Sequence, residues 1–158
     1  MNYTWNDYIP EKMSFVESWL DAEAIQNTGI DDGWNDFFTY WKNDSEMVYG
    51  KNFWCKVVSE KDTPFAAIAF SVFCEEFVIM EIVVAPFYRR RGYGSKLLKE
   101  LLSSGKTICG QEIKRARAVI FPGNVGSQKA FENAGFSFFC ASEDGDAWDY
   151  QYGFPKEP

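Results

Sequence analysis

The stretch that decides the fold is Ile82–Leu102, IVVAPFYRRRGYGSKLLKELL, which joins an apolar run to three consecutive arginines, a Gly-x-Gly turn and a leucine stripe. The leucines at 97–102 recur at helical spacing, which predicts a strand, a glycine-rich turn and then a helix over about Tyr93–Ser103. The first amides of a helix lack intrahelical acceptors, and glycines let an anion approach the backbone. The stretch therefore predicts an anion site where this helix begins.

Two common phosphate-binding motifs do not fit these residues. A dinucleotide fingerprint, GxGxxG, would need a third glycine where Leu97 stands. The GKT at Gly105–Thr107 has Glu100 in place of the first glycine of a Walker loop, and it follows a helix instead of a strand. The stretch is therefore either an anion site of a type other than these two motifs, or simply a basic loop exposed to solvent.

The flanking sequence predicts the remaining elements. Upstream, apolar residues at helical spacing predict a helix over Pro10–Gln26, with a stop at Asn27–Gly29, and an aromatic stripe predicts a second short helix within 31–44. Extended patterns then predict a three-strand meander over 53–60, 64–73 and 77–85, and further downstream a strand over 116–122, a helix over 124–135 and a hairpin over 136–153. This order predicts an α/β layered domain with a mixed sheet covered by helices.

Composition limits the class of protein. The 158 residues suit a single domain, 1–158, and no linker or repeat divides them. No apolar run approaches the roughly 20 residues of a membrane span, and the start MNYTWNDYIP lacks the regions of a signal peptide, so we expect a cytoplasmic protein without a membrane partner. The four cysteines form no CxxC pair and mostly lie in apolar sequence, which favours reduced core residues.

The charged residues exclude several functions. The chain has no histidine, which excludes a histidine base and argues against a zinc site, so no metal is expected. The net charge of -7 argues against a nucleic-acid partner and is compatible with a cationic partner.

Two motifs in the right order identify a resemblance. RxxGxG runs from Arg89 through Gly92 to Gly94, and downstream the pattern N-x-x-[A/S]-x-x-x-[Y/F]-x-x-x-G-F is matched with every spacing kept by Asn124, Ser127, Phe131, Gly135 and Phe136. Over roughly 77–138 the chain resembles the GCN5-related N-acetyltransferase (GNAT) superfamily. The resemblance implies a mixed, largely antiparallel twisted sheet flanked by about four helices, with a splay between strands 4 and 5.

The resemblance also implies acetyl-coenzyme A as co-substrate. Main-chain groups of Ile82, Val83 and Val84 would hold the pantetheine arm. The pyrophosphate would lie on the loop formed by Arg89, Arg90, Arg91, Gly92, Tyr93, Gly94 and Ser95. Asn124 would contact the arm, with Ser127 and Phe131 facing it. The alternatives are a tight turn at the two glycines, a helix cap at Asn124 and a core position for Phe131.

The implied reaction is direct transfer of an acetyl group to a primary amine, without a covalent enzyme intermediate. Phe131 stands where many family members carry the tyrosine that protonates the departing thiolate, so this acid is absent. Glu81, a charged residue in an apolar strand, is the candidate base, and its alternative is an ion-paired strand carboxylate. Tyr150 and Tyr152 are candidate thiolate donors, although both could simply pack.

We expect a small cationic amine as the acceptor. Acidic residues interleaved with aromatic ones suggest a pocket for it, namely Asp31, Asp32, Asp36, Glu75, Glu76, Asp144 and Asp146 with Trp34, Trp148 and Tyr150. A protein amine is the alternative acceptor, and a non-catalytic acyl-CoA-binding module is the alternative function. The sequence leaves a monomer and a homodimer open.

Overall fold

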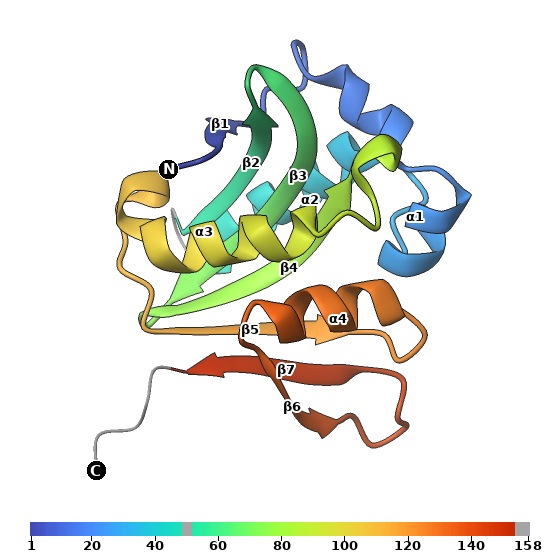
Figure 1. Ribbon diagram of the computed structural model, residues 1–158, viewed down its shortest axis with the longest axis vertical. Helices are drawn as coiled ribbons and strands as arrows, with labels where there is room; N and C mark the ends of the chain where they lie inside the picture. The colour runs from blue at the N-terminus through green and yellow to red at the C-terminus, as the bar shows by residue number, and fades with distance from the viewer. Residues whose placement is uncertain (49–51, 154–158) are drawn as a thin grey trace.

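The computed structural model describes residues 1–48 and 52–153 (Figure 1). The strands are β1 (Thr4–Asp7), β2 (Phe53–Glu60), β3 (Thr63–Phe73), β4 (Glu76–Val84), β5 (Arg115–Ile120), β6 (Ser137–Ala141) and β7 (Trp148–Gly153). The helices are the 3-10 turns η1 (Ser14–Trp19) and η2 (Pro86–Tyr88) and the α-helices α1 (Ala22–Thr28), α2 (Trp34–Val48), α3 (Tyr93–Cys109) and α4 (Val125–Asn133).

All seven described strands form one sheet in the order β1-β2-β3-β4-β5-β7-β6. Within it β4 and β5 pair in parallel, whereas the other neighbouring strands pair antiparallel. The parallel pair arises because α3 carries the chain from the end of β4 back to the start of β5, as a crossover requires. The predicted mixed, largely antiparallel sheet is confirmed.

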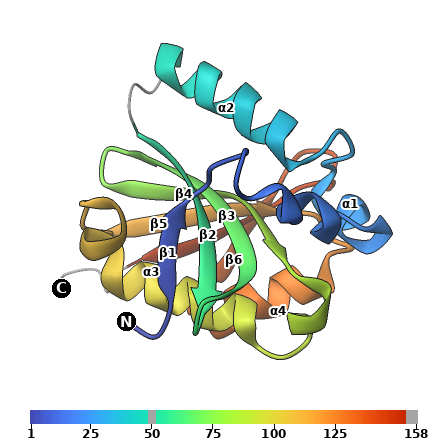
Figure 2. The same ribbon diagram turned by 90° about the horizontal axis from the view of Figure 1, so that it is seen from above.

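Helices cover both faces of the sheet (Figure 2). The first core lies under α3 and α4, where Leu97, Leu98 and Leu101 are fully buried against Phe65 and Phe70 of β3. The second core lies under η1, α1 and α2, and its largest fully buried side chain is Trp34. Because β3 contributes alternate residues to the two cores, it reads as a continuous apolar run.

The single helix predicted over Pro10–Gln26 is wrong. The chain forms η1, breaks at Leu20 (φ −85°, ψ 63°) and begins α1 with Asp21 as N-cap, whose Oδ1 accepts a hydrogen bond from the Ala24 amide at 3.0 Å. An aspartate that can cap is favoured just outside a helix, so its capping prevailed over the apolar spacing. The predicted stop is confirmed, since Gly29 ends α1 in the left-handed conformation.

The end of α3 also differs from the prediction. The helix loses regular geometry at Ser104 (φ −125°, ψ 21°), within the predicted stop, but a further helical turn extends it to Cys109. Gly105 permits the close approach of the following segment, because a Cβ there would lie 2.7 Å from Ile113 Cγ1.

The cysteine prediction holds for Cys55 alone, which is buried in β2. Cys74 lies exposed in the turn before β4, Cys140 lies exposed on β6, and Cys109 is half-buried. Apolar neighbours misled the prediction because β6 is a sheet edge whose five residues are all exposed. All four cysteines are free thiols.

Candidate functional site

The parallel strands β4 and β5 separate partway along their length. Their pairing covers Glu76–Ile79 of β4 and Arg115–Ala118 of β5 and then stops, although β4 continues to Val84 and remains paired with β3. One edge of β4 beyond Ile79 is therefore open, which is the splay that the sequence predicted.

Backbone alternation decides which groups face this opening. The Ala85 amide donates to the Phe65 carbonyl at 2.7 Å, so Ala85 points its backbone toward β3. Successive residues of a strand point their backbone groups to opposite edges, so Val83 also faces β3, whereas Ile82 and Val84 face the opening. Arg89 Nε donates to the Val84 carbonyl at 2.9 Å, which leaves Ile82 and the Val84 amide directed into the opening.

The loop after β4 contains two left-handed residues just before α3 begins. Arg90 and Gly92 both have left-handed backbone conformations (φ 61° and 81°), and such turns form concave nests of amides. Gly92 caps α3 without a side-chain hydrogen bond, and the first helical bond runs from the Lys96 amide to the Gly92 carbonyl at 3.1 Å. The amides of 93–95 are therefore the groups of this helix start that lack intrahelical acceptors.

Each of the three arginine side chains contacts another side chain of the protein. Arg89 is 13% exposed, donates to the Trp19 carbonyl at 2.7 Å and forms an ion pair with Asp21 at 2.8 Å. Arg90 forms an ion pair with Glu23 at 2.6 Å. Arg91 lies over the ring of Phe87, 4.5 Å from its centroid. The partners of Arg89 and Arg90 were missed by sequence reasoning, although the capping character of Asp21 was a readable signal.

The second motif lies on α4 and its flanks. Asn124 Oδ1 accepts a hydrogen bond from the Ser127 amide at 3.1 Å, so the residue is the N-cap that the sequence offered as an alternative. Phe131 is buried, and its ring meets that of Phe136 edge-on at 4.9 Å. Gly94 lies against α4, since a Cβ there would be 3.5 Å from Ala130 Cβ. The two motifs thus lie side by side through the contact of α3 with α4.

A bulge in β4 places Glu81 on the face of the second core. Ala69 pairs with Glu81 while Phe70 pairs with Ile79, so Met80 is the extra residue. Glu81 Oε2 is buried and has no hydrogen-bond partner among the described residues. Burial raises the pKa of the Glu81 carboxyl to about 8. A buried carboxyl that titrates near neutral pH, next to an open strand edge, has the properties of a general base.

The face that carries Glu81 is open over the neighbouring strand. Val119 of β5 is 58% exposed, whereas the corresponding face of β2 and β3 lies under η1 and α2. Asp149 pairs with Val119 from β7, and its Oδ2 accepts hydrogen bonds from Arg117 at 3.2 Å and Gln151 at 3.0 Å. A molecule could therefore approach Glu81 across the exposed surface of β5.

The two tyrosines proposed as acids lie in the first core. Tyr150 is 2% exposed, and its hydroxyl donates to Glu132 Oε1 at 3.2 Å. Burial and the nearby Glu132 carboxylate raise the pKa of the Tyr150 hydroxyl. The ring of Tyr152 lies 5.6 Å from that of Phe136.

The predicted acidic pocket is divided between two ends of the sheet. Glu75 and Glu76 lie at the start of β4 and pair with Lys114 and Arg115 at 3.1 and 3.9 Å. They lie about 26 Å from the other end of β4, where the splay and the arginine loop are, given 3.3 Å per strand residue, so they do not belong to the site. Trp34 is wholly buried and forms no site wall. The remaining acids follow α1, begin α2 or lie in the turn between β6 and β7: Asp31, Asp32, Asp36, Asp144 and Asp146.

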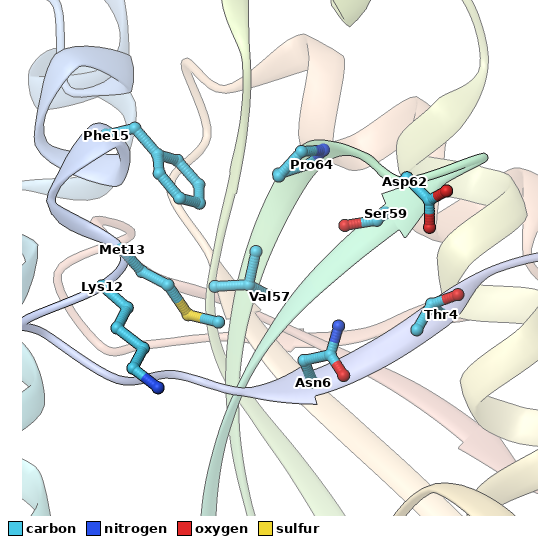
Figure 3. Close-up of a pocket in the computed structure, with 9 residues that line it drawn as sticks. All are labelled: Thr4, Asn6, Lys12, Met13, Phe15, Val57, Ser59, Asp62 and Pro64. Atoms are coloured by element: carbon cyan, nitrogen blue, oxygen red, sulfur yellow. The ribbon is translucent and has the colours of Figure 1, made fainter.

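A pocket of about 250 Å³ lies away from this site, beside β1 (Figure 3). Phe15 and Met13 face Val57, Ser59 and Pro64 across it, and no residue of either motif lines it.

Within residues 1–48 and 52–153, no cluster of three or more metal-ligating side chains occurs. No helix in the described parts of the chain is long and apolar enough to cross a bilayer.

The profile of one known protein family matches most of the chain. The profile of the acetyltransferase (GNAT) family matches residues 11–136. No curated protein matches the chain.

Solved structures share the fold at low sequence identity. Aminoglycoside acetyltransferase AAC(6')-Ib in complex with coenzyme A superposes with a TM-score of 0.74 and 14% identity, over 96% of this chain and 94% of that chain. The ribosomal-protein-S18-alanine N-acetyltransferase from Escherichia coli gives 0.64 and 16%, over 98% and 97%. A spermidine N-acetyltransferase chimera from Vibrio cholerae and hSSAT gives 0.69 and 12%, over 96% and 95%.

Proposed function

The chain belongs to the acetyltransferase (GNAT) family, and we propose that it transfers an acetyl group from acetyl-coenzyme A directly to a primary amine of a small cationic molecule. The observation that carries the proposal is Glu81, whose Oε2 is buried with no hydrogen-bond partner among the described residues and which lies two residues beyond the point where β4 and β5 stop pairing. An anion nest and a candidate base thus occur on one strand and the loop that follows it.

The residues present fit the coenzyme. The amides of the loop and of the first turn of α3 would hold the diphosphate, and Ile82 with the Val84 amide would hold the amide-bearing arm in the splay. Acetyl-coenzyme A supplies a thioester, whose carbonyl carbon is the electrophile. Placing that carbon beside a bound amine supplies much of the rate enhancement through proximity.

The elevated pKa of Glu81 matters for the amine. An alkylammonium group has a pKa of ~10.4, so its proton must be removed before the nitrogen can attack. Proton transfer to an ordinary glutamate at ~4.3 would cost about 8 kcal/mol, at 1.36 kcal/mol per pKa unit. Transfer to a carboxylate with a pKa of about 8 costs about 3 kcal/mol on the same scale. Glu81 would therefore accept the proton of the bound ammonium group.

Protonation of the departing thiolate requires less catalysis than deprotonation of the amine. A thiol has a pKa of ~8.5, so the thiolate is a tolerable leaving group near neutral pH. Tyr150 is the proposed donor, but its hydroxyl must first leave Glu132. Phe131 lies in the core and has no proton to give, so we assign it a packing role.

Charge supports a cationic small-molecule acceptor. The acids retained at the coenzyme end and the net charge of -7 favour a cation. Among the structural neighbours, one is an aminoglycoside acetyltransferase and another a spermidine N-acetyltransferase, which act on small amines. The ribosomal-protein alanine N-acetyltransferase keeps a protein amine as the alternative.

Thiol release from acetyl-coenzyme A, measured with aminoglycosides, polyamines, simple primary amines and peptides, tests the proposal. We expect at least one small cationic amine to accelerate release, and Glu81→Gln to abolish most of that acceleration. Tight coenzyme binding without acceleration by any amine would favour a binding module instead. Acceleration by peptides alone would move the acceptor to proteins.

A further inference from the structure

Helix α1 spans the open end of the splay. Its first turn contacts the loop that follows β4, through Asp21 and Glu23. At its other end the Asn27 carbonyl lies 3.5 Å from Asn124 Nδ2, just beyond β5. Figures 1 and 2 both show α1 beside the start of α4. The coenzyme loop therefore contacts the protein's own acidic side chains before any ligand arrives.

The two arginines that make these contacts are held very differently. Arg89 is 13% exposed, and two main-chain carbonyls and Asp21 fix its guanidinium group. Arg90 is 75% exposed, and its guanidinium group is held by the carboxylate of Glu23, itself 45% exposed. Exposed ion pairs are weak, each changing an equilibrium constant by up to about fivefold. The side chain of Arg90 can therefore leave Glu23 at a small cost in free energy, whereas that of Arg89 is held by several buried contacts.

Glu23 also reaches Arg89. Its Oε1 lies 2.6 Å from Arg90 Nη2, and its Oε2 lies 3.4 Å from Arg89 Nη1. A single carboxylate therefore occupies both arginines next to the amide nest. A diphosphate entering that nest meets a negative charge and a cation that is already paired.

We propose that Glu23 is a tethered competitor of the coenzyme diphosphate for Arg90. The inference rests on the proposed function only in taking coenzyme A as the ligand of the loop. When the pair is closed, Arg90 is unavailable, and when the diphosphate binds, Arg90 turns to it and the Glu23 carboxylate is released to solvent. Closure of the pair therefore lowers the observed affinity, by no more than the roughly fivefold that an exposed ion pair supplies.

Competition between Glu23 and the diphosphate for Arg90 would accelerate release of the product coenzyme. Product release limits many transferases, and a site that holds the spent coenzyme too tightly turns over slowly. A weak internal competitor accelerates departure of the product coenzyme, because Glu23 recaptures Arg90 as the diphosphate leaves. Arg89 meanwhile keeps the loop and α1 in place.

A double-mutant cycle tests the proposal by calorimetric titration with coenzyme A. We expect Glu23→Gln to tighten binding about fivefold and Arg90→Gln to weaken it. In the Arg90→Gln background, Glu23→Gln should change the affinity by less than about twofold, because the competition needs both partners. Glu11→Gln, an equal charge change at an exposed site of the same segment, should have little effect in either background.

Three outcomes would overturn the proposal. Unchanged or weaker binding by Glu23→Gln removes the competition. Equal tightening in both backgrounds assigns the effect to long-range repulsion instead of to the pair. A wild-type chain that does not bind coenzyme A overturns the proposed function as well, whereas the first two outcomes leave that function intact. The dissociation rate of coenzyme A, measured by stopped flow, should fall about fivefold in Glu23→Gln and gives an independent readout.

Discussion

The proposed coenzyme end and the proposed acceptor side of this molecule are formed by different kinds of groups. The coenzyme end consists of main-chain groups: an open strand edge, a nest of two left-handed residues and a helix start. The acceptor side consists of side chains, with Glu81 on a bulge and acids on loops after α1 and β6. Main-chain sites depend on backbone conformation, whereas side-chain sites depend on single residues, so the two halves should respond differently to substitution.

The largest expected effect is at the nest. Gly92 has φ 81° and, among the described residues, no atom within 4 Å of an added Cβ, so Gly92→Glu should fold and place a carboxylate in the proposed anion site. We expect coenzyme binding to weaken on the order of 1,000-fold, because like charges placed together cost several kcal/mol. Calorimetric titration measures the loss.

Gly110→Glu is the matched control for that variant. Gly110 has φ 76° and equally open surroundings at the other end of α3, so its strain is the same, about 1 to 2 kcal/mol, without a nearby anion site. Equal weakening in both variants would refute the assignment of the nest.

The second prediction separates catalysis from coenzyme binding. Glu81→Gln should lower the acetylation rate about 100-fold or more, as removal of a general base does, while coenzyme affinity changes less than about twofold. For the native enzyme, kcat/KM should rise with pH through about 8, because the base acts when deprotonated, and the variant should lose this limb. Glu76→Gln, at the far end of the same strand, should keep both, and an unchanged rate in Glu81→Gln would remove the base assignment.

The third prediction concerns stability alone. The folded Glu81 carboxyl titrates at about 8 instead of 4.5, so between these values the native state binds more protons than the unfolded state. The free energy of unfolding must therefore fall as pH rises through this window. Glu81→Gln should stabilise the protein by about 4 kcal/mol at pH 8 and by almost nothing at pH 4. Denaturant unfolding at both values measures this, and a gain that is independent of pH would contradict it.

The smallest effect is expected at Tyr150. Since a thiolate with a pKa of ~8.5 leaves readily, Tyr150→Phe should slow acetylation by less than about 10-fold near neutral pH. Glu132→Ala provides the comparison, because it removes the acceptor of the Tyr150 hydroxyl and should not slow the reaction.

The sequence predicted those features that depend on neighbouring residues. The strand, the glycine turn at Gly92 and the start of α3 follow from apolar spacing and from positions that only glycine adopts readily. The four-residue edge strand β1 was missed, because its mostly exposed residues carry no alternating pattern. The break between η1 and α1 was missed because the apolar spacing continues through Asp21.

Other features depend on distant parts of the chain and could not be predicted. The role of Arg89 is set by Asp21 and Trp19, which lie 68 and 70 residues away. The bulge that turns Glu81 toward the second core is a matter of register between β3 and β4, which spacing within one strand does not specify. The predicted acidic pocket was wrong for Glu75 and Glu76, because the strand order places them at the opposite end of the sheet from the other acids.

The guanidinium group of Arg89 also has a consequence for how the protein forms. It joins the last residue of β4 to the segment between η1 and α1, so the coenzyme loop is complete only after the N-terminal segment has docked. Contacts of such long sequence separation form late, because the intervening chain must close a long loop. We therefore expect strands β2 to β7 to form the sheet before the loop between β4 and α3 reaches the conformation that binds the coenzyme. Coenzyme affinity would then appear as the last property regained on refolding, after the secondary structure has already recovered.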